Sequence, residues 1–406
     1  MRRVLICLAI LLSHVVIVGC CSTRTCVGPA DTRARAMKWF SPSIAPLKTH
    51  TGEQLSESIR ECVSKAGPEP MNVLILSGGG QNGAFGAGFL NGLAARTEKP
   101  DLQFDIVTGI STGALQATHA FLGPEYYERL KQAYTTVSKE DIYRDRFILD
   151  LICASSIKDT APLRSLVEEF ITMDILHQVA QAHEAGRRLY IGTVNVDTGE
   201  FVPWNMGEIA TKHNQEALRL YHDILMASAS IPLLFPPVLI RQVTSSGAAS
   251  ETLHTDGGTR ETVFFRQFMV EFINAVQKAM REAGPYGAIA RLDEAAMTVI
   301  VNGKIGLGYE CTQERWASVG IRSLSALMDQ STVNAVFRAY ALGCSNGISF
   351  RMVRIPDDTE IDSHSWEFDT DTMRRLFNLG FDMAQSDPIP WETKPPTAED
   401  IDSLCR

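Results

Sequence analysis

The sequence predicts an α/β protein, a three-layer α/β/α sandwich around a mostly parallel central sheet. Two consecutive strand-turn-helix units, beginning near residues 71 and 104, carry this prediction. A third observation supports it, because apolar strands and amphipathic helices continue to alternate almost to the end of the chain. Parallel strands need crossover helices, and these helices cover both faces of the sheet.

The first unit consists of an apolar run over residues 71–76, a glycine-rich turn and a helix-length segment that continues to residue 95. The second unit repeats this order with a strand over 104–108, a tight turn over 109–113 and an apolar helix from residue 114. Both turns therefore follow the carboxyl ends of strands that we expect to be neighbours.

The rest of the chain extends the pattern. Residues 188–196 and 199–204 alternate like a hairpin, 215–229 have helical spacing, and 297–301 form a short apolar strand. Amphipathic helices over 323–342 and 372–384 flank a strand over 348–355. No linker divides residues 71–390, so we expect one domain there and a C-terminal tail over 391–406.

The N-terminus has the pattern of an export signal. Arg2 and Arg3 precede an uncharged run over residues 4–18, which as a helix would span about 22 Å, short of the roughly 30 Å hydrocarbon core. Residues 1–19 are therefore interpreted as a signal peptide. The run ends in Ile17, Val18, Gly19 and Cys20, which resembles the lipobox of bacterial lipoproteins.

That resemblance implies that Cys20 becomes the lipidated first residue and anchors the protein to a membrane surface. Because Cys21 rather than an aspartate follows, it further implies an outer-membrane location facing the periplasm. A plain secretory signal cut near Gly19 is the alternative. Residues 20–70 are rich in Ser, Thr, Pro and charge apart from a short amphipathic stretch over 55–63, and we interpret them as a tether.

The composition excludes several classes. The ordinary apolar and charged content is not that of a fibrous or disordered chain, and a net charge of -9 argues against nucleic acid as a partner. Nine cysteines occur, and their spacing matches no zinc pattern. The disulfide pairing and the oligomeric state stay open.

Gly109, Ser111 and Gly113 form a G-x-S-x-G motif directly after a predicted strand. In this context the glycines permit a sharp turn that presents the serine hydroxyl, and the following helix directs its N-terminal dipole toward it. The motif makes Ser111 a candidate nucleophile. An ordinary tight strand-helix connection is the alternative.

The upstream glycines strengthen the case for acyl transfer. Gly78, Gly79 and Gly80 could supply backbone N–H donors to an oxyanion. With Gly83 they also satisfy the dinucleotide-binding pattern G-x-G-x-x-G. That alternative needs an acidic residue at the end of the second strand, whereas Asp101 and Asp105 stand at its start.

A serine nucleophile needs a base, and an α/β-hydrolase triad would place a histidine after the acid. After Asp256 only His364 remains, within a polar stretch typical of a solvated loop. His254 precedes Asp256 by two residues and so cannot be the usual downstream partner.

These blocks together resemble the patatin-like phospholipases. In that family a glycine loop supplies the oxyanion hole, G-x-S-x-G bears the nucleophile, and D-G-[GA] bears the aspartate of a Ser-Asp dyad. The counterparts here are the Gly78 to Gly83 loop, Ser111, and Asp256 with Gly257 and Gly258. The stretch 227–236 also resembles the family's segment ahead of the aspartate. Asn82 departs from the family's Arg or Lys.

The resemblance implies that Asp256, ionised at neutral pH, accepts the Ser111 proton during attack on a phospholipid or other acyl ester. An acyl-enzyme then forms and water releases the acid, without a metal or cofactor. Two alternatives stay open: a catalytically silent envelope protein that binds lipid or a partner, and an acyltransferase that uses the same dyad.

Overall fold

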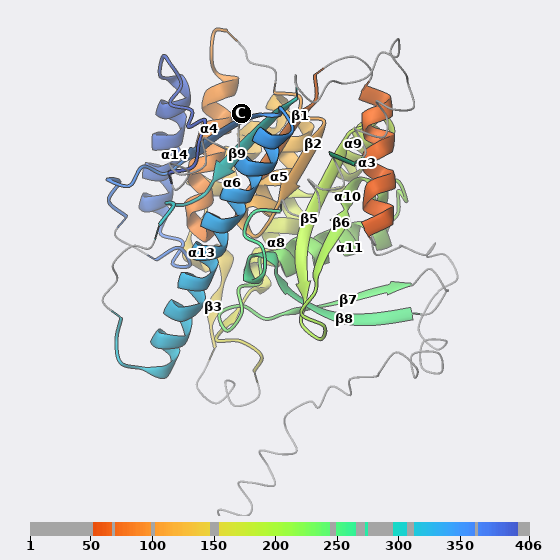
Figure 1. Ribbon diagram of the computed structural model, residues 1–406. Coiled ribbons are helices and arrows are strands. Elements are labelled where there is room, and N and C mark those ends of the chain that lie inside the picture. Colours follow the sequence, from red (N-terminus) through yellow and green to blue (C-terminus); the bar gives the residue numbers. More distant parts are fainter. Residues whose placement is uncertain are drawn as a thin grey trace, which may run out of the picture.

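A computed structural model describes residues 52–66, 70–98, 102–146, 154–243, 249–264, 273–274, 295–306, 312–361 and 364–396. A central β-sheet is covered by helices on both faces (Figure 1). The predicted α/β/α sandwich with a mostly parallel sheet is therefore confirmed.

The sheet has the strand order β10-β9-β1-β2-β5-β8-β7, and β6 pairs with β5. Neighbours from β10 to β5 are parallel, whereas β6, β7 and β8 are joined by antiparallel pairing. The bounds are β1 (Asn72–Leu76), β2 (Ile106–Gly109), β5 (Arg188–Asn195), β6 (Phe201–Asn205), β7 (Val238–Val243), β8 (Ala249–Asp256), β9 (Ala296–Val301) and β10 (Ser349–Arg354).

The alternation of side chains along β1 divides the core into two layers. Leu74 and Leu76 belong to the larger apolar cluster, whereas Val73 and Ile75 belong to the smaller one. The larger cluster is built with α4 (Gly83–Ala94), α5 (Thr112–Leu122), α6 (Tyr127–Thr135), α8 (Ala161–Phe170), α9 (Met173–Glu184), α10 (Met206–Ala210), α11 (Gln215–Ser228) and α14 (Thr370–Gln385). The smaller one is built with α3 (Gly52–Ala66) and α13 (Trp316–Ser345).

Two glycines of α4 let α14 approach closely. A Cβ on Gly88 would lie 1.9 Å from the Phe377 carbonyl oxygen, and one on Gly92 would lie 2.5 Å from the Phe381 carbonyl oxygen. Only glycine fits such a contact between two helix backbones, so these residues fix the distance between α4 and α14.

Every strand and helix predicted from the sequence occurs, with shifted ends for several. The segment between α5 and β5 was not assigned from the sequence, and it contains α6, α7 (Lys139–Ile142), α8 and α9, together with the short hairpin β3 (Arg144–Asp145) and β4 (Lys158–Asp159). The β7-β8 hairpin, which delivers Asp256, was not predicted either. It extends the sheet beyond β5, because β8 pairs antiparallel with β5 and β7 pairs antiparallel with β8.

The expected tether over residues 20–70 is wrong at its C-terminal end, because residues 52–66 form helix α3 against the sheet. Leu55 and Ile59 are fully buried. The buried Arg188 donates from Nε to the Ser58 carbonyl at 3.1 Å and to the Ser58 hydroxyl at 3.0 Å. The amphipathic stretch noted in the sequence is thus part of the folded domain.

The boundary of the C-terminal tail also needs correction. The Trp391 ring packs edge-on against Phe89 at 5.0 Å between centroids. Glu392 and Met352 exchange backbone hydrogen bonds of 2.8 and 2.9 Å. The domain therefore continues at least through residue 392.

The signal peptide over 1–19, Cys20 and the rest of the expected tether lie outside the described residues. Among the helices that are described, none combines the length and the apolar character needed to cross a bilayer.

Candidate active site

Ser111 stands on a strained turn between β2 and α5. Its backbone has φ 55° and ψ -125°, and its side chain is 3% exposed. A Cβ on Gly109 would lie 2.4 Å from the Gly113 carbonyl oxygen, and one on Gly113 would lie 2.4 Å from that of Leu76. Because a non-glycine residue pays a conformational cost at positive φ, this geometry indicates a functional role for Ser111.

Ser228 braces this turn, and no motif in the sequence singled it out. The Ser111 N–H donates to the Ser228 hydroxyl at 3.1 Å, and that hydroxyl donates to the Gly192 carbonyl at 2.7 Å. The only signal was its place within the stretch 227–236. The chain of two hydrogen bonds fixes the Ser111 backbone to strand β5.

Asp256 ends strand β8 at the same level of the sheet as Ser111. Gly109 pairs with Ile191 of β5, and Asp256 pairs with Thr193, two residues farther along β5. Ser111 likewise lies two residues beyond Gly109. Ser111 and Asp256 are 145 positions apart in the sequence, and the register of the sheet brings both to one edge.

The Asp256 carboxyl is fully buried. Its Oδ1 accepts a hydrogen bond of 2.7 Å from the Gly258 N–H, and its Oδ2 has no hydrogen-bond partner among the described residues. A carboxylate oxygen without a partner in a buried site is costly, so it is a candidate acceptor for a proton.

Burial raises the pKa of Asp256 from 3.8 to about 7. The Ser111 hydroxyl and the Gly258 N–H oppose this rise. Ser111 is therefore close enough to affect the Asp256 carboxyl, although Oδ2 has no formed hydrogen bond. The expectation that Asp256 is ionised at neutral pH is corrected, since a pKa of about 7 leaves it close to half-protonated there.

Gly257 and Gly258 let the turn after Asp256 approach its neighbours. A Cβ on Gly257 would lie 2.7 Å from the Gly192 carbonyl oxygen, and one on Gly258 would lie 3.0 Å from Oδ1 of Asp256. Larger residues would displace the carboxyl, which explains the D-G-G sequence in local terms.

The glycine loop after β1 lies beside Ser111. A Cβ on Gly78 would be 3.3 Å from the Ser111 Cβ. The Gly78 N–H, however, donates to the Thr262 carbonyl at 3.1 Å. Gly78 is therefore removed from the expected set of oxyanion donors, because its N–H is already used.

Gly79 and Gly80 remain as donors. They have φ values of 153° and 56°, and their N–H groups have no acceptor among the described residues. Glycine is needed at both positions on steric grounds too, since a Cβ would come within 1.9 Å of the Asn302 carbonyl oxygen at Gly79 and 2.1 Å of the Ser365 carbonyl oxygen at Gly80. Two adjacent free N–H groups beside a serine can stabilise an oxyanion.

Asn302 and Gln81 hold this loop, and sequence analysis missed both because their partners are distant in the chain. Asn302 Nδ2 donates to the Ser77 carbonyl at 2.9 Å. The fully buried Gln81 donates from Nε2 to the His364 carbonyl at 2.7 Å and accepts from the Asp369 N–H at 2.8 Å. For Gln81 the only available signal in the sequence was an amide side chain directly after the glycine run.

Gly83 and Asn82 follow in the same loop. A Cβ on Gly83 would lie 2.1 Å from Thr112 Oγ1, so this glycine permits close packing of α4 against the start of α5. Asn82 is half-buried, and its Oδ1 has no partner within the described part of the chain. Asn82 lines the wider of two pockets at the site.

The two histidines considered as bases have other roles. His254 is buried, and its Nδ1 and Nε2 contact the hydroxyls of Thr193 at 2.9 Å and Thr252 at 2.8 Å. With both nitrogens in use it braces β8 ahead of Asp256. His364 lines the wider pocket, where its ring stacks on Trp366 with centroids 4.4 Å apart.

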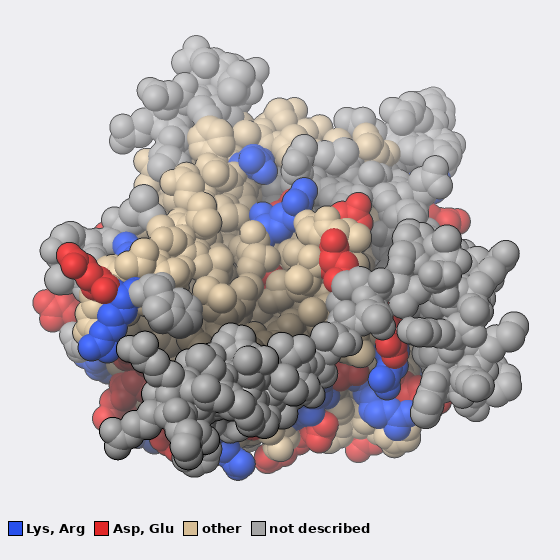
Figure 2. Space-filling view, turned by 90° about the horizontal axis from the view of Figure 1, so that it is seen from below, with Lys and Arg blue, Asp and Glu red and all other residues tan. Residues whose placement is uncertain are grey.

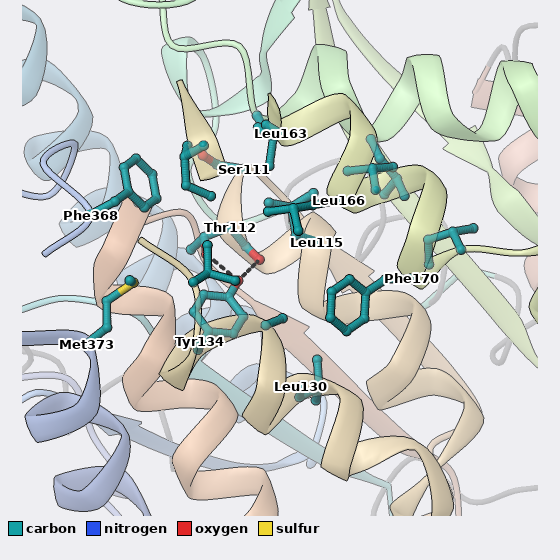
Figure 3. A pocket seen from close by; sticks show the side chains of 18 of the residues that line it. Ser111, Thr112, Leu115, Leu130, Tyr134, Leu163, Leu166, Phe170, Phe368 and Met373 are labelled. Atoms are coloured by element: carbon teal, nitrogen blue, oxygen red, sulfur yellow. Dashed lines mark hydrogen bonds between the residues drawn. The ribbon is translucent and has the colours of Figure 1, made fainter. Parts of the chain in front are cut away.

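Ser111 lies where two pockets meet. A narrow apolar pocket of about 90 Å³ runs between α5, α6 and α8, and a wider, partly polar pocket of about 400 Å³ lies between the glycine loop and α13. In Figure 3 Ser111 stands at one side of the apolar pocket and Phe170 at the other, with Leu115 and Leu166 between them. An extended apolar group attached to a reactive carbonyl fits this arrangement.

No group of three or more His, Cys, Asp or Glu side chains is placed to hold a metal ion within the described ranges.

Comparison with known proteins identifies the domain that holds these residues. Residues 74–269 match the model of the family described as patatin-like phospholipase. This stretch contains the glycine loop, Ser111 and Asp256. Among solved structures the chain is similar to VipD from Legionella pneumophila, at 12% identity and a TM-score of 0.30 over 77% of this chain and 67% of that one. A comparison with the curated proteins gave no match.

Because the pKa of Asp256 is raised, we expect the stability of the protein to depend on pH. In the unfolded chain its pKa is about 3.9, so the folded state binds an additional proton between about pH 4 and 7, and stability falls as the pH rises through this window. Asp256→Asn removes this cost. We expect the increase in the free energy of unfolding of this variant over wild type to be larger at about pH 8 than at about pH 5, by on the order of 2 kcal/mol.

Denaturant unfolding at the two pH values measures the effect, and Asp358→Asn, at an exposed position, is the matched control. An equal effect of Asp256→Asn at both pH values would show that the carboxyl has no raised pKa.

Proposed function

The chain contains a domain of the patatin-like phospholipase family, a family of lipid acyl hydrolases, and on this basis we propose that it is a serine hydrolase of lipid acyl esters with a Ser111-Asp256 dyad. The observation that carries the proposal is the buried Asp256 carboxyl, with its Oδ2 unpartnered, beside a serine on a strained turn. A structural aspartate would have both oxygens satisfied.

In the first step Asp256 Oδ2 accepts the Ser111 hydroxyl proton while Oγ attacks the ester carbonyl carbon. The carbonyl oxygen gains negative charge, and the N–H groups of Gly79 and Gly80 donate to it. The C–O bond to the leaving alcohol then breaks, and Asp256 returns the proton to that alcohol. A base with a pKa of about 7 suits both directions of this transfer.

In the second step water attacks the acyl-enzyme. Asp256 accepts a proton from the water as its oxygen bonds to the carbonyl carbon, and the same two N–H groups stabilise the second oxyanion. The bond to Ser111 Oγ then breaks, and Oγ recovers its proton from Asp256 as the fatty acid leaves. No side chain other than Asp256 is needed for proton transfer.

We propose that the two parts of the substrate bind in the two different pockets. The acyl chain occupies the narrow apolar pocket, where burial of each methylene is favourable by about 0.8 kcal/mol. The alcohol part, such as a glycerophosphate headgroup, occupies the wider pocket, which contains Asn82, Lys304 and Arg322. The unpartnered Asn82 Oδ1 is an acceptor for a hydroxyl of that alcohol.

A membrane location suits such a substrate, and we propose that Cys20 is lipid-modified and holds the domain at the outer membrane, facing the periplasm. Residues 21–51 precede α3 and span up to about 100 Å when fully extended. In the view from below (Figure 2), uncharged residues cover a broad area, and charged side chains of both signs lie within it and along its edges. The projecting end of α13 points to this face (Figure 1).

The dyad makes a prediction about activity. Ser111→Ala and Asp256→Asn should each lower kcat/KM for a phospholipid or short-chain ester by at least about a thousandfold, because the two residues act as one unit. The double variant should lose no more than either single one. Ester hydrolysis measured beside the exposed control Ser64→Ala tests this.

Retention of most activity in Asp256→Asn would contradict the dyad. Absence of activity in folded wild type, on every acyl ester tried, would favour a silent lipid-binding protein.

The lipid anchor makes a separate prediction. Wild type should fractionate with membranes and carry a modified Cys20 at its N-terminus, whereas Cys20→Ser should be soluble or unprocessed. Mass spectrometry of the mature N-terminus, with Cys21→Ser as the matched control, measures this. A soluble wild type with an unmodified N-terminus would contradict the anchor and leave the dyad unaffected.

A further inference from the structure

His119 is a buried polar residue that the mechanism above does not use. It lies on α5, is 3% exposed, and lines the same apolar pocket as Ser111. Neither ring nitrogen has a hydrogen-bond partner within the described part of the chain. Both are shielded from water, so the ring carries two unsatisfied polar atoms, each of which costs free energy on burial.

Two other buried histidines of the described chain have hydrogen-bond partners. His222 Nε2 contacts the Ile171 carbonyl at 2.7 Å, and His254 uses both of its nitrogens. The half-buried His183 also has one nitrogen, Nδ1, without a partner among the described residues. His119 differs from all three because both of its nitrogens are unpaired and because it lines the pocket of Ser111.

The Phe170 carbonyl approaches the His119 ring but does not satisfy it. Burial, and after it Arg129, lower the pKa of His119 to about 4, whereas the Phe170 carbonyl raises it. The geometry falls short of a hydrogen bond, and the Phe170 carbonyl already accepts from Arg129 Nη1 at 3.3 Å. Even if the ring donated to this carbonyl, its second nitrogen would stay an acceptor without a donor.

His119 lies far along the pocket from the reacting centre. It follows Ser111 by eight positions, and at about 1.5 Å per helical residue the two backbones are about 12 Å apart. Its ring contacts Phe170, with centroids 6.3 Å apart, and Phe170 stands across the pocket from Ser111 (Figure 3). With C–C bonds of about 1.5 Å, an extended chain of roughly ten carbons covers this distance.

We propose that His119 is a specificity-determining residue that binds a hydroxyl group near the far end of the acyl chain, so that the preferred substrates are esters of hydroxylated fatty acids of medium length. The inference rests on the proposed hydrolase function. A hydroxyl group both donates and accepts, and it therefore satisfies a neutral imidazole. An unsubstituted chain leaves the nitrogens unpaired, and such a site discriminates against it.

The test compares p-nitrophenyl decanoate with its ω-hydroxy counterpart and with the isomer that carries the hydroxyl next to the carboxyl carbon. Wild type should hydrolyse the ω-hydroxy ester with a kcat/KM at least about tenfold above that of the plain ester. The isomer with the hydroxyl beside the carboxyl should show no such gain, because its hydroxyl does not reach His119.

His119→Leu should reverse the preference by lowering kcat/KM for the ω-hydroxy ester and raising it for the plain ester. His119→Asn, which keeps a donor and an acceptor, should restore part of the preference. His177→Leu, a histidine outside this pocket, is the matched control and should leave the ratio unchanged.

Equal hydrolysis of the plain and ω-hydroxy esters by wild type would overturn the inference, as would an equal loss on both esters in a folded His119→Leu, which indicates a structural role. If His119→Leu does not fold, the wild-type series of hydroxyl positions decides alone. Failure of wild type to hydrolyse any ester would contradict the proposed hydrolase function itself.

Discussion

Asp256 ends β8 with a carboxyl group that is fully buried, and its pKa is set by that burial against the opposing contacts of Ser111 and Gly258. The same burial that makes ionisation costly makes the carboxylate a stronger base than an exposed one. The surrounding chain is arranged to maintain this burial. The antiparallel β8 brings the carboxyl to the level of Ser111, and the glycines after it leave room only for backbone.

The geometry of the site also depends on close contact between three backbone segments. The loop after β1, the turn that bears Ser111 and the turn after Asp256 pack so closely that a methyl group on Gly79, Gly113 or Gly257 would overlap a neighbouring carbonyl. Such packing fixes the N–H groups of the loop before any substrate binds. Preorganised donors of this kind contribute more to catalysis than donors that must move into position.

The sequence predicted the parts of this arrangement that are encoded locally. Apolar runs followed by glycine turns located β1, β2 and Ser111, and the ordered motifs located Asp256. The rest depends on contacts between distant residues. Nothing near Gly78 indicates that its N–H donates to Thr262, and nothing near Ser111 indicates the brace from Ser228. The raised pKa of Asp256 and the burial of α3 likewise follow only from tertiary packing.

Labelling with an organophosphonate ester tests the central claim most directly, because the reagent reacts with a serine activated by a base and an oxyanion hole. We expect that Ser111 alone is labelled, that the rate rises with pH through about 7 as Asp256 ionises, and that Asp256→Asn removes the reaction. Label on Ser228 or Ser230, or a rate that does not change with pH through this range, would contradict it.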